Sequence, residues 1–287
     1  MSDRTRDART DRPRDGRTDH PRDPGTDRTR DARIATIVNL LAGAGHQEFQ
    51  VRRLPALLGV SGATVRRDLA AMERQGMVRR SYGRVAAAHQ SAELPVGLRR
   101  TQHTEAKRRI GALAASLLPT RPLTIALGGG STVGFVAGSL VHRADLTVVT
   151  NTIGTATALL ARQAVKVVMT GGVARPLSDE LVGPAAARTL RSHRFDVAVL
   201  GVDGVCPVHG LTRHTACGAE IDRVMLERAR RRIVVADSSK LGRVRSARIA
   251  DAGSVDTVVT DAHADRDLVA ALRRSGVTTL LVPSRLP

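Results

Sequence analysis

The chain has 287 residues, a formal net charge of +18 and two cysteines. Its length is enough for two domains, each with its own core. No charged segment leads into an apolar stretch at the N-terminus, and no apolar run approaches the roughly 18 residues that span a bilayer. Secretion, a disulfide framework and membrane insertion are therefore disfavoured, and we expect a cytoplasmic protein. The basic excess favours a polyanionic partner.

Residues 1 to 32 form a low-complexity segment of Arg, Asp, Thr, Pro and Gly, with nine Arg, eight Asp and an Asp at every fourth position. The segment lacks the apolar side chains that would offset the entropy of ordering, so we expect a disordered tail. Its near balance of charge disfavours the alternative of a DNA-tethering arm. A start codon assigned upstream of the true gene start would also explain the repeat.

Residues 33 to 88 are expected to form one domain with three short helices, and the net charge between positions 33 and 90 is +6. Apolar residues recur at helical spacing, and a glycine follows each pattern. The expected inward-facing sets are Ile34, Ile37, Val38 and Leu41, then Val51, Leu54, Leu57 and Leu58, and finally Val65, Leu69 and Met72. Only Gly59-Val60-Ser61 separates the second and third helices, which is typical of a helix-turn-helix motif.

The third helix has the features of a DNA recognition helix. Ser61 can cap it, and its outward face carries small residues followed by two arginines. Residues 77–81 and 84–88 flank Tyr82-Gly83 as a basic hairpin, the wing of a winged helix. The expected DNA-binding residues are Ser61, Gly62, Ala63, Thr64, Arg66, Arg67, Arg80 and Arg84. The competing interpretation is an ordinary three-helix bundle with a solvated basic face.

This stretch resembles the N-terminal signature of the DeoR family of bacterial transcription regulators. The resemblance is carried by Leu57 to Ser61, Thr64 to Leu69, Glu73, Gly76 and Arg80. Pro55 departs from the family pattern, which usually has Ala there, and Arg84 stands where a His-Gly-Gly turn is common. Pro55 is expected to remove one hydrogen bond near the first turn of the second helix, a local strain.

A linker is expected at residues 89–103, followed by a larger domain over residues 104–287. Short β-branched runs alternate there with amphipathic helices, which is the pattern of a parallel α/β sheet. The expected strands are 124–127, 146–150, 165–170, 196–202, 233–236, 256–260 and 277–282. The predicted fold is therefore an N-terminal winged helix-turn-helix followed by a parallel-sheet α/β domain.

Polar residues and glycines follow five of these strands and predict a ligand site at the strands' carboxyl ends. Gly128 to Thr132 opens a helix, so its amides, hydroxyls and helix dipole can hold a phosphate. Val133 stands where a dinucleotide fingerprint needs glycine, and no P-loop lysine follows. The expected effector-binding residues are Gly129, Gly130, Ser131, Thr132, Asn151, Gly172, Asp203 and Lys240. Tight turns of an α/β fold would explain any one of these loops alone.

The resemblance to the DeoR family continues through this region to residue 282. It implies a C-terminal domain that is similar to sugar-phosphate isomerases and senses a phosphorylated metabolite, which releases DNA. The implied roles are phosphate binding by hydroxyls and amides, sugar hydroxyl binding by Asn151 and Asp203, and anion binding by Lys240. Gly218 and Asp222 replace the Glu and Lys common in the family, and Asp222 would place an anion beside the expected phosphate site.

Four candidate metal ligands, Cys206, His209, His214 and Cys217, fall within twelve residues. Their spacing is not that of a common zinc module, and the same loop borders the expected effector site. We therefore predict no metal and no cofactor.

The favoured function is a DNA-binding transcription regulator, in particular a repressor. It would bind double-stranded operator DNA, respond to a phosphorylated sugar-like metabolite and form a homo-oligomer, a dimer or tetramer. The alternative is a sugar-phosphate isomerase or deaminase with an appended DNA-binding module. Asp203 could then act as the base, but Gly218 offers no second carboxylate, so we expect no enzyme. A purely electrostatic nucleic-acid binder would not need the ordered series of strand-end loops.

Overall fold

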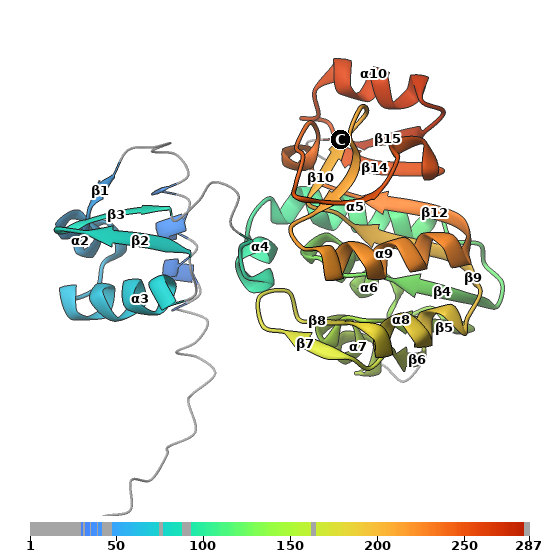
Figure 1. Cartoon of the computed structure of the whole chain (residues 1–287), viewed down its shortest axis with the longest axis horizontal. Coiled ribbons are helices and arrows are strands. Elements are labelled where there is room, and N and C mark those ends of the chain that lie inside the picture. Colours follow the sequence, from blue (N-terminus) through green and yellow to red (C-terminus); the bar gives the residue numbers. More distant parts are fainter. Residues whose placement is uncertain are drawn as a thin grey trace, which may run out of the picture.

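The computed structural model describes residues 30, 32–34, 36–38, 40–41, 48–74, 77–87, 93–161 and 165–283. They form a small N-terminal domain and a larger α/β domain (Figure 1). Most of the segment predicted as a disordered tail lies outside the described residues. Arg30 and Ala32 are helical, so the first helix begins before Arg33.

The N-terminal domain packs three helical segments and a three-stranded sheet around one apolar cluster. The helical residues described between 30 and 41 are followed by β1 (Phe49–Gln50), the 3-10 turn η1 (Val51–Arg53), α2 (Leu54–Leu58), α3 (Gly62–Arg74), β2 (Val78–Ser81) and β3 (Arg84–Ala87). Strand β3 pairs antiparallel with both β1 and β2. Ile37, Leu54, Val65, Leu69 and Met72 are fully buried in the cluster. The predicted winged helix-turn-helix is confirmed.

Three details of this domain differ from the sequence predictions. Leu57 is exposed, because the five-residue helix α2 already turns Leu54 into the core. Pro55 lies in the first turn of α2, where its missing N–H would have no intrahelical partner, so the expected loss of a hydrogen bond does not occur. Strand β1 has two residues, too few to show an alternating pattern.

The α/β domain is built on a seven-stranded sheet in which every strand pair is parallel. The strands are β4 (Leu123–Leu127), β5 (Leu146–Thr150), β6 (Lys166–Met169), β9 (Phe195–Gly201), β12 (Ala229–Val235), β14 (Thr257–Asp261) and β15 (Thr278–Val282). All seven predicted strands are present, although β12 begins four residues earlier than expected. The strand order is β15-β14-β12-β9-β4-β5-β6. From β4 the chain adds β5 and β6 on one side, and then β9 and the later strands on the other. The crevice beyond the carboxyl ends of β4 and β9 is therefore a topological switch point.

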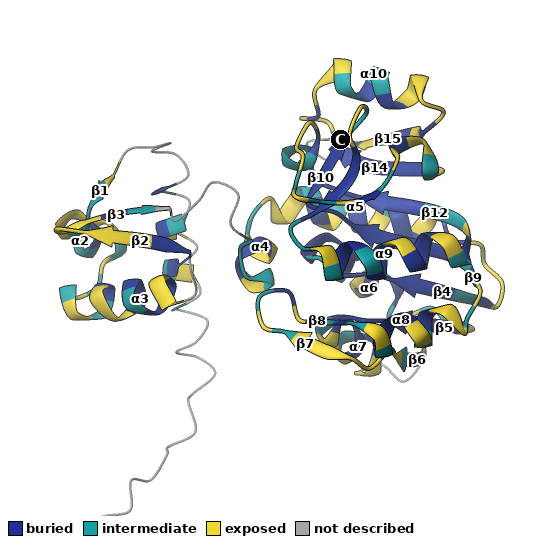
Figure 2. Ribbon diagram, in the orientation of Figure 1, coloured by how far each residue is buried: buried dark blue, intermediate teal, exposed yellow. Residues whose placement is uncertain are grey.

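Helices cover both faces of this sheet, whose strands are mostly buried (Figure 2). The flanking helices are α5 (Thr104–Ser116), α6 (Ser131–Leu140), α7 (Ile153–Leu160), α8 (Pro184–Arg191), α9 (Ala216–Arg228) and α10 (Arg266–Arg274). Successive strand residues point to opposite faces. In β9, Val197 and Val199 face the cluster of α5 and α6, whereas Ala198 and Leu200 face that of α8 and α9.

Short elements complete the domain. They are α4 (Val96–Thr101), β7 (Val173–Arg175), β8 (Glu180–Val182), β10 (Gly204–Cys206), β11 (Gly210–Arg213), η2 (Ser238–Lys240), β13 (Ala247–Ala250) and η3 (Ala252–Ser254). The hairpins β7–β8 and β10–β11 follow the carboxyl ends of β6 and β9, so they extend from the edge of the sheet where the ligand site was predicted. Helix α4 lies inside the segment predicted as a linker.

Candidate functional site

The recognition helix α3 presents its arginines to solvent because its apolar side is fixed in the core. Val65 and Leu69 are fully buried, while Arg66 and Arg67 are exposed. The Ser61 hydroxyl accepts the backbone N–H of Thr64 at 3.2 Å, which caps the helix as expected.

A groove runs between α3 and the wing. Its lining residues include Gly62, Arg66, Arg80 and Arg84, together with Arg52 and Tyr82. Tyr82 is fully exposed at the tip of the wing, with a positive φ of 39°. Arg52 and Tyr82 were not among the predicted DNA-binding residues, because an arginine in a 3-10 turn and a tyrosine in a hairpin turn belong to no periodic pattern. Four arginines around one groove suit a phosphate backbone.

In the α/β domain, the loop after β4 lies against the end of β9 at the switch point. A Cβ atom on Gly201 would come within 2.6 Å of the Gly129 carbonyl oxygen. Gly130 has a φ of +113°, which disfavours any other residue. These glycines bring the loop directly to the crevice between the two strands.

Helix α6 begins in this crevice. Its first intrahelical bond runs from the Gly134 N–H to the Gly130 oxygen at 3.2 Å, so the amides of the preceding turn are available to an anion. The side chains of Ser131 and Thr132 are buried beside them. The amides and hydroxyls of Gly129 to Thr132 therefore lie at the N-terminus of α6, where the sequence predicted an anion site.

Asp203 follows β9 at the same crevice and is buried. One carboxylate oxygen lies 3.5 Å from Nη1 of Arg99, and the other accepts the backbone N–H of His214 at 3.2 Å. Burial opposes ionisation of Asp203, but the positive charges of Arg213 and Arg99 outweigh it and lower the pKa. Asp203 is therefore an ionised acceptor at neutral pH.

Two lysines add positive charge here. Nζ of Lys107 donates to the Arg99 carbonyl oxygen at 2.5 Å and lies 3.7 Å from the Asp237 carboxylate. Burial lowers the pKa of Lys107 to about 8, against the attraction of Asp237. Burial also lowers the pKa of Lys240, whose charge is favoured by Asp237 and Asp203. Arg99, Lys107 and Lys240 thus lie around Asp203 and Asp237, so charges of both signs meet at the crevice.

A second group of buried charges centres on Arg213, at the end of β11. Its Nε and Nη2 donate to the two oxygens of Asp222 at 2.5 and 3.1 Å, and Nη1 donates to Glu180 at 3.0 Å. Burial raises the pKa of Asp222 to about 6, although the Arg213 charge acts in the opposite direction. Arg213 therefore neutralises the negative charge that Asp222 was expected to place beside the phosphate site.

Glu180 connects this group to the loop of Gly129 to Thr132. A Cβ atom on Gly129 would come within 1.6 Å of a Glu180 carboxylate oxygen, so the loop can lie on Glu180 only as glycine. A Cβ atom on Gly218 would point toward the other Glu180 oxygen at 3.8 Å. An acidic side chain at position 218 would bring a second negative charge to Glu180.

Two predicted effector residues have other contacts. The Asn151 side chain is buried, and its Nδ2 donates to the Leu181 carbonyl oxygen at 3.2 Å, which joins β5 to β8. Gly172 is exposed in the turn before β7, where a Cβ atom would come within 2.6 Å of the Val182 oxygen. The structure gives both residues a packing role. It brings together Gly129 to Thr132, Asp203 and Lys240, and adds Arg99 and Lys107.

The four cysteines and histidines of the β10 to α9 region do not converge. His214 lies beside Asp203, whereas Cys217 donates to Thr215 at the start of α9. Across the part of the chain that the structure describes, no three His, Cys, Asp or Glu side chains are placed to hold a metal ion.

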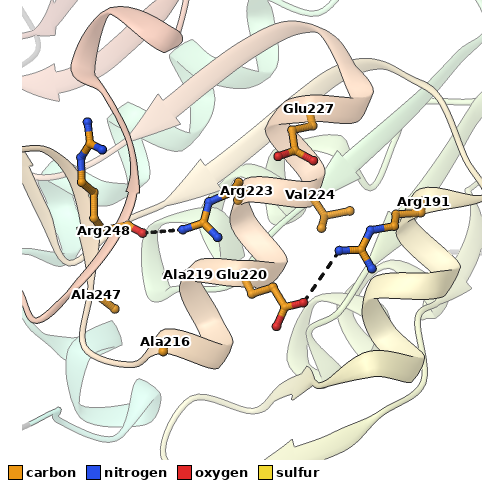
Figure 3. A pocket seen from close by; sticks show the side chains of 9 residues that line it. All are labelled: Arg191, Ala216, Ala219, Glu220, Arg223, Val224, Glu227, Ala247 and Arg248. Atoms are coloured by element: carbon orange, nitrogen blue, oxygen red, sulfur yellow. Dashed lines mark hydrogen bonds and ion pairs between the residues drawn. The ribbon is translucent and has the colours of Figure 1, made fainter.

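A surface groove of about 440 Å³ lies on the outer side of α9 (Figure 3). It is lined by charged side chains that pair with one another or with backbone. Arg191 lies 3.8 Å from Glu220, and Arg223 donates to the Arg248 carbonyl oxygen at 2.8 Å. Asp222 and Gly218 are buried in the same helix and do not line this groove, which is therefore separate from the crevice.

Comparison with known proteins agrees with both regions. A model described as the DeoR-like helix-turn-helix domain matches residues 33–91, and one described as the DeoR C terminal sensor domain matches residues 102–262. The chain is 35% identical, over 81% of its length and 87% of the relative's, to the putative aga operon transcriptional repressor of Escherichia coli O157:H7. It is 29% identical, over 71% of its length and 80% of the relative's, to the glycerol-3-phosphate regulon repressor of Escherichia coli K12.

Among solved structures, ribose 5-phosphate isomerase A from Methanocaldococcus jannaschii is similar over 49% of this chain and 55% of its own, with 18% identity and a TM-score of 0.37. No helix within the described ranges is long and apolar enough to cross a membrane.

Proposed function

Because the chain belongs to the DeoR family of transcription regulators, we propose that it represses genes by binding an operator and that a phosphorylated sugar-like metabolite bound at the switch point changes its affinity for DNA. We place it in the cytoplasm as a dimer or tetramer, since symmetric assemblies match palindromic operators. It is a regulator and not an enzyme.

The observation that carries this proposal is the position of the N-terminus of α6 at the switch point. Amides of the first helical turn and the hydroxyls of Ser131 and Thr132 offer hydrogen bonds to phosphate oxygens. Lys240 supplies a cation near Asp203, and Asp203 can accept hydroxyl groups of a sugar. Such a set of donors favours a ligand with one phosphate and several hydroxyls.

Repression is supported by the relatives. The two described above are named as repressors, one of the aga operon and one of the glycerol-3-phosphate regulon. The groove between α3 and the wing supplies the surface for operator DNA, because its arginines are exposed and the helix that presents them is rigidly packed.

The enzyme alternative has less support. A general base for an isomerase needs a pKa near the working pH. The pKa of Asp203 is lowered by Arg213 and Arg99, and Asp222, whose pKa is higher, is occupied on both oxygens by Arg213. Neither carboxylate is poised to move a proton between carbon atoms.

The test combines DNA binding with a ligand panel. Fluorescence anisotropy would measure binding of the full chain to duplex DNA from upstream of its own gene. Glycerol 3-phosphate, fructose 6-phosphate and ribose 5-phosphate would be added and compared with their unphosphorylated counterparts and with inorganic phosphate. We expect one phosphate ester to change operator affinity at least about tenfold, while its unphosphorylated counterpart has no effect.

Equal effects of the phosphorylated and unphosphorylated compounds would contradict the phosphate site. Failure to bind the upstream DNA at low salt would contradict the proposal that the protein is a DNA-binding regulator. Conversion of a sugar phosphate to its isomer, followed by NMR with stoichiometric protein, would favour the enzyme.

A further inference from the structure

Two buried arginines of the α/β domain use the same edge of the guanidinium group differently. The edge formed by Nε and Nη2 of Arg213 holds both oxygens of Asp222. Arg99 contacts Asp203 through Nη1, while its Nε and Nη2 have no hydrogen-bond partner among the described residues. The Arg99 side chain is only 8% exposed, so bulk solvent does not cover these donors.

The nearest acidic group does not satisfy this edge. A Glu93 oxygen lies 3.8 Å from Nη2 of Arg99, too far for a hydrogen bond. Glu93 instead forms a closer ion pair with Arg175. Buried charged donors without acceptors destabilise a fold. The Nε–Nη2 edge is also the one that binds two oxygens of a carboxylate or phosphate in parallel.

Arg99 lies where a ligand could act on the DNA-binding domain. It belongs to α4, the first helix after residues 88–92. Its neighbour Leu98 is buried in the apolar cluster of the N-terminal domain. On the other side, Arg100 lies against α6, since a Cβ atom on Gly134 would come within 3.0 Å of its Nη2. One turn of helix therefore contacts both domains and the helix that begins at the crevice.

We infer that Arg99 is a ligand-binding residue, whose Nε–Nη2 edge holds two phosphate oxygens of the effector and thereby fixes α4 when the site is occupied. The ligand class is an anion with two oxygens on one atom, and this inference rests on the proposed function. Occupancy of the site would be transmitted through Leu98, because fixing Arg99 in α4 also fixes the residue that precedes it.

The first test compares two lysine substitutions in the full-length chain. Arg99→Lys keeps the positive charge but removes the two-donor edge, and Arg108→Lys makes the same change at an exposed position of α5. Calorimetry would use inorganic phosphate and the three sugar phosphates named above, and anisotropy would follow operator release. We expect Arg99→Lys to bind the preferred phosphate at least tenfold more weakly and to lose release, with operator affinity unchanged. Arg108→Lys should behave as the wild type.

Binding and release by Arg99→Lys within twofold of wild type would overturn the inference. A second measurement needs no variant: hydrogen exchange of the wild type with and without the same phosphates. We expect slower exchange both in residues 129–134 and in residues 96–101. Protection of 129–134 alone would refute the role of Arg99 and leave the proposed function standing. Protection of neither segment at saturating concentrations would reject the phosphate site and the role of Arg99 together.

Discussion

The two domains of this protein place their arginines in opposite environments. In the N-terminal domain, Arg66 and Arg67 are exposed and form no ion pair with any of the described residues. In the α/β domain, Arg99 and Arg213 are buried and contact carboxylates. The same residue type therefore provides a mobile charge for a polyanion in one domain and a fixed donor in the other.

This difference determines how strongly salt affects each domain. Exposed arginines gain affinity for DNA by releasing counterions, and that gain falls as salt rises. Buried pairs such as Arg213 and Asp222 are screened little by salt, and their net value depends on complete hydrogen bonding. We therefore expect operator binding to depend strongly on salt and the stability of the α/β domain to depend on it only weakly.

The largest effect is expected from breaking the buried network. Asp222→Asn removes the charge that neutralises Arg213 and should lower the free energy of unfolding by about 3–5 kcal/mol. Glu220→Gln on the same helix is the control, because Glu220 forms a half-exposed pair with Arg191 and should change stability by less than about 1 kcal/mol. Urea unfolding measures both. Similar small losses in the two variants would show that the buried group does not stabilise the domain.

The exposed side of the comparison is tested by Arg66→Ala/Arg67→Ala. Loss of base or phosphate contacts should weaken operator binding by about 2–4 kcal/mol and reduce the salt slope by about one unit per lost phosphate contact. Arg266→Ala/Arg274→Ala removes the same charge from exposed positions of α10 and should change neither quantity much. Unchanged affinity and slope in the first variant would disprove the assignment of α3 as the recognition helix.

A buried cation should give the α/β domain a characteristic dependence on pH. The pKa of Lys107 is lowered to about 8, so between pH 8 and about 10 the unfolded chain binds more protons than the folded one. Stability of the wild type relative to Lys107→Met should therefore rise by up to about 3 kcal/mol over this range. The exposed Lys166→Met should show no such trend. Parallel curves for wild type and Lys107→Met would contradict the buried charge.

Alanine substitutions at two glycines distinguish the effect of close packing from the effect of helix propensity on stability. Gly129→Ala would drive Glu180 away from Arg213 and should lower stability by about 1–3 kcal/mol and weaken phosphate binding. Gly138→Ala, in the interior of α6 with open space around it, should raise stability by up to about 1 kcal/mol. Thermal unfolding distinguishes the signs. A stable Gly129→Ala would mean that Glu180 can leave the loop without loss.

The sequence predicted the parts of the molecule that rest on local pattern. Alternating strands and helices gave all seven strands of the main sheet, and helical spacing gave Val65, Leu69 and Met72 as the buried side of α3. The loop from Gly129 to Thr132 was predicted as a ligand-binding loop because glycine and hydroxyl residues follow a strand and open a helix. These signals lie within a few residues of one another.

Contacts between distant segments could not be predicted in this way. Arg213 joins Glu180 and Asp222, and Arg99 reaches Asp203 more than a hundred residues later. Arg99 also lies in a helix of six residues, too short for a periodic signal. One clue was present: two of the three lysines in this arginine-rich chain, Lys107 and Lys240, are in the crevice.

The smallest effect is expected from shortening the N-terminus, near the one carboxylate that is buried among the described residues of the DNA-binding domain. Asp68 is 3% exposed and pairs with Arg33 at 2.9 Å and Arg30 at 3.4 Å. Deleting residues 2–29 keeps both arginines, and the nearly balanced charge of the repeat disfavours a role in DNA binding. Stability and operator affinity should therefore change by less than about 0.5 kcal/mol.

Adding Arg33→Met to this truncation leaves Asp68 with Arg30 alone and should lower stability by about 1–3 kcal/mol. Circular dichroism during urea unfolding compares the two truncated chains, and anisotropy compares their operator affinity. A large loss of affinity already in the first truncation would identify residues 2–29 as a DNA-binding arm, because the folded domain and its arginines would be unchanged. Equal stability of the two truncated chains would instead mean that Asp68 does not need Arg33, and that the buried charge of this domain is balanced by Arg30.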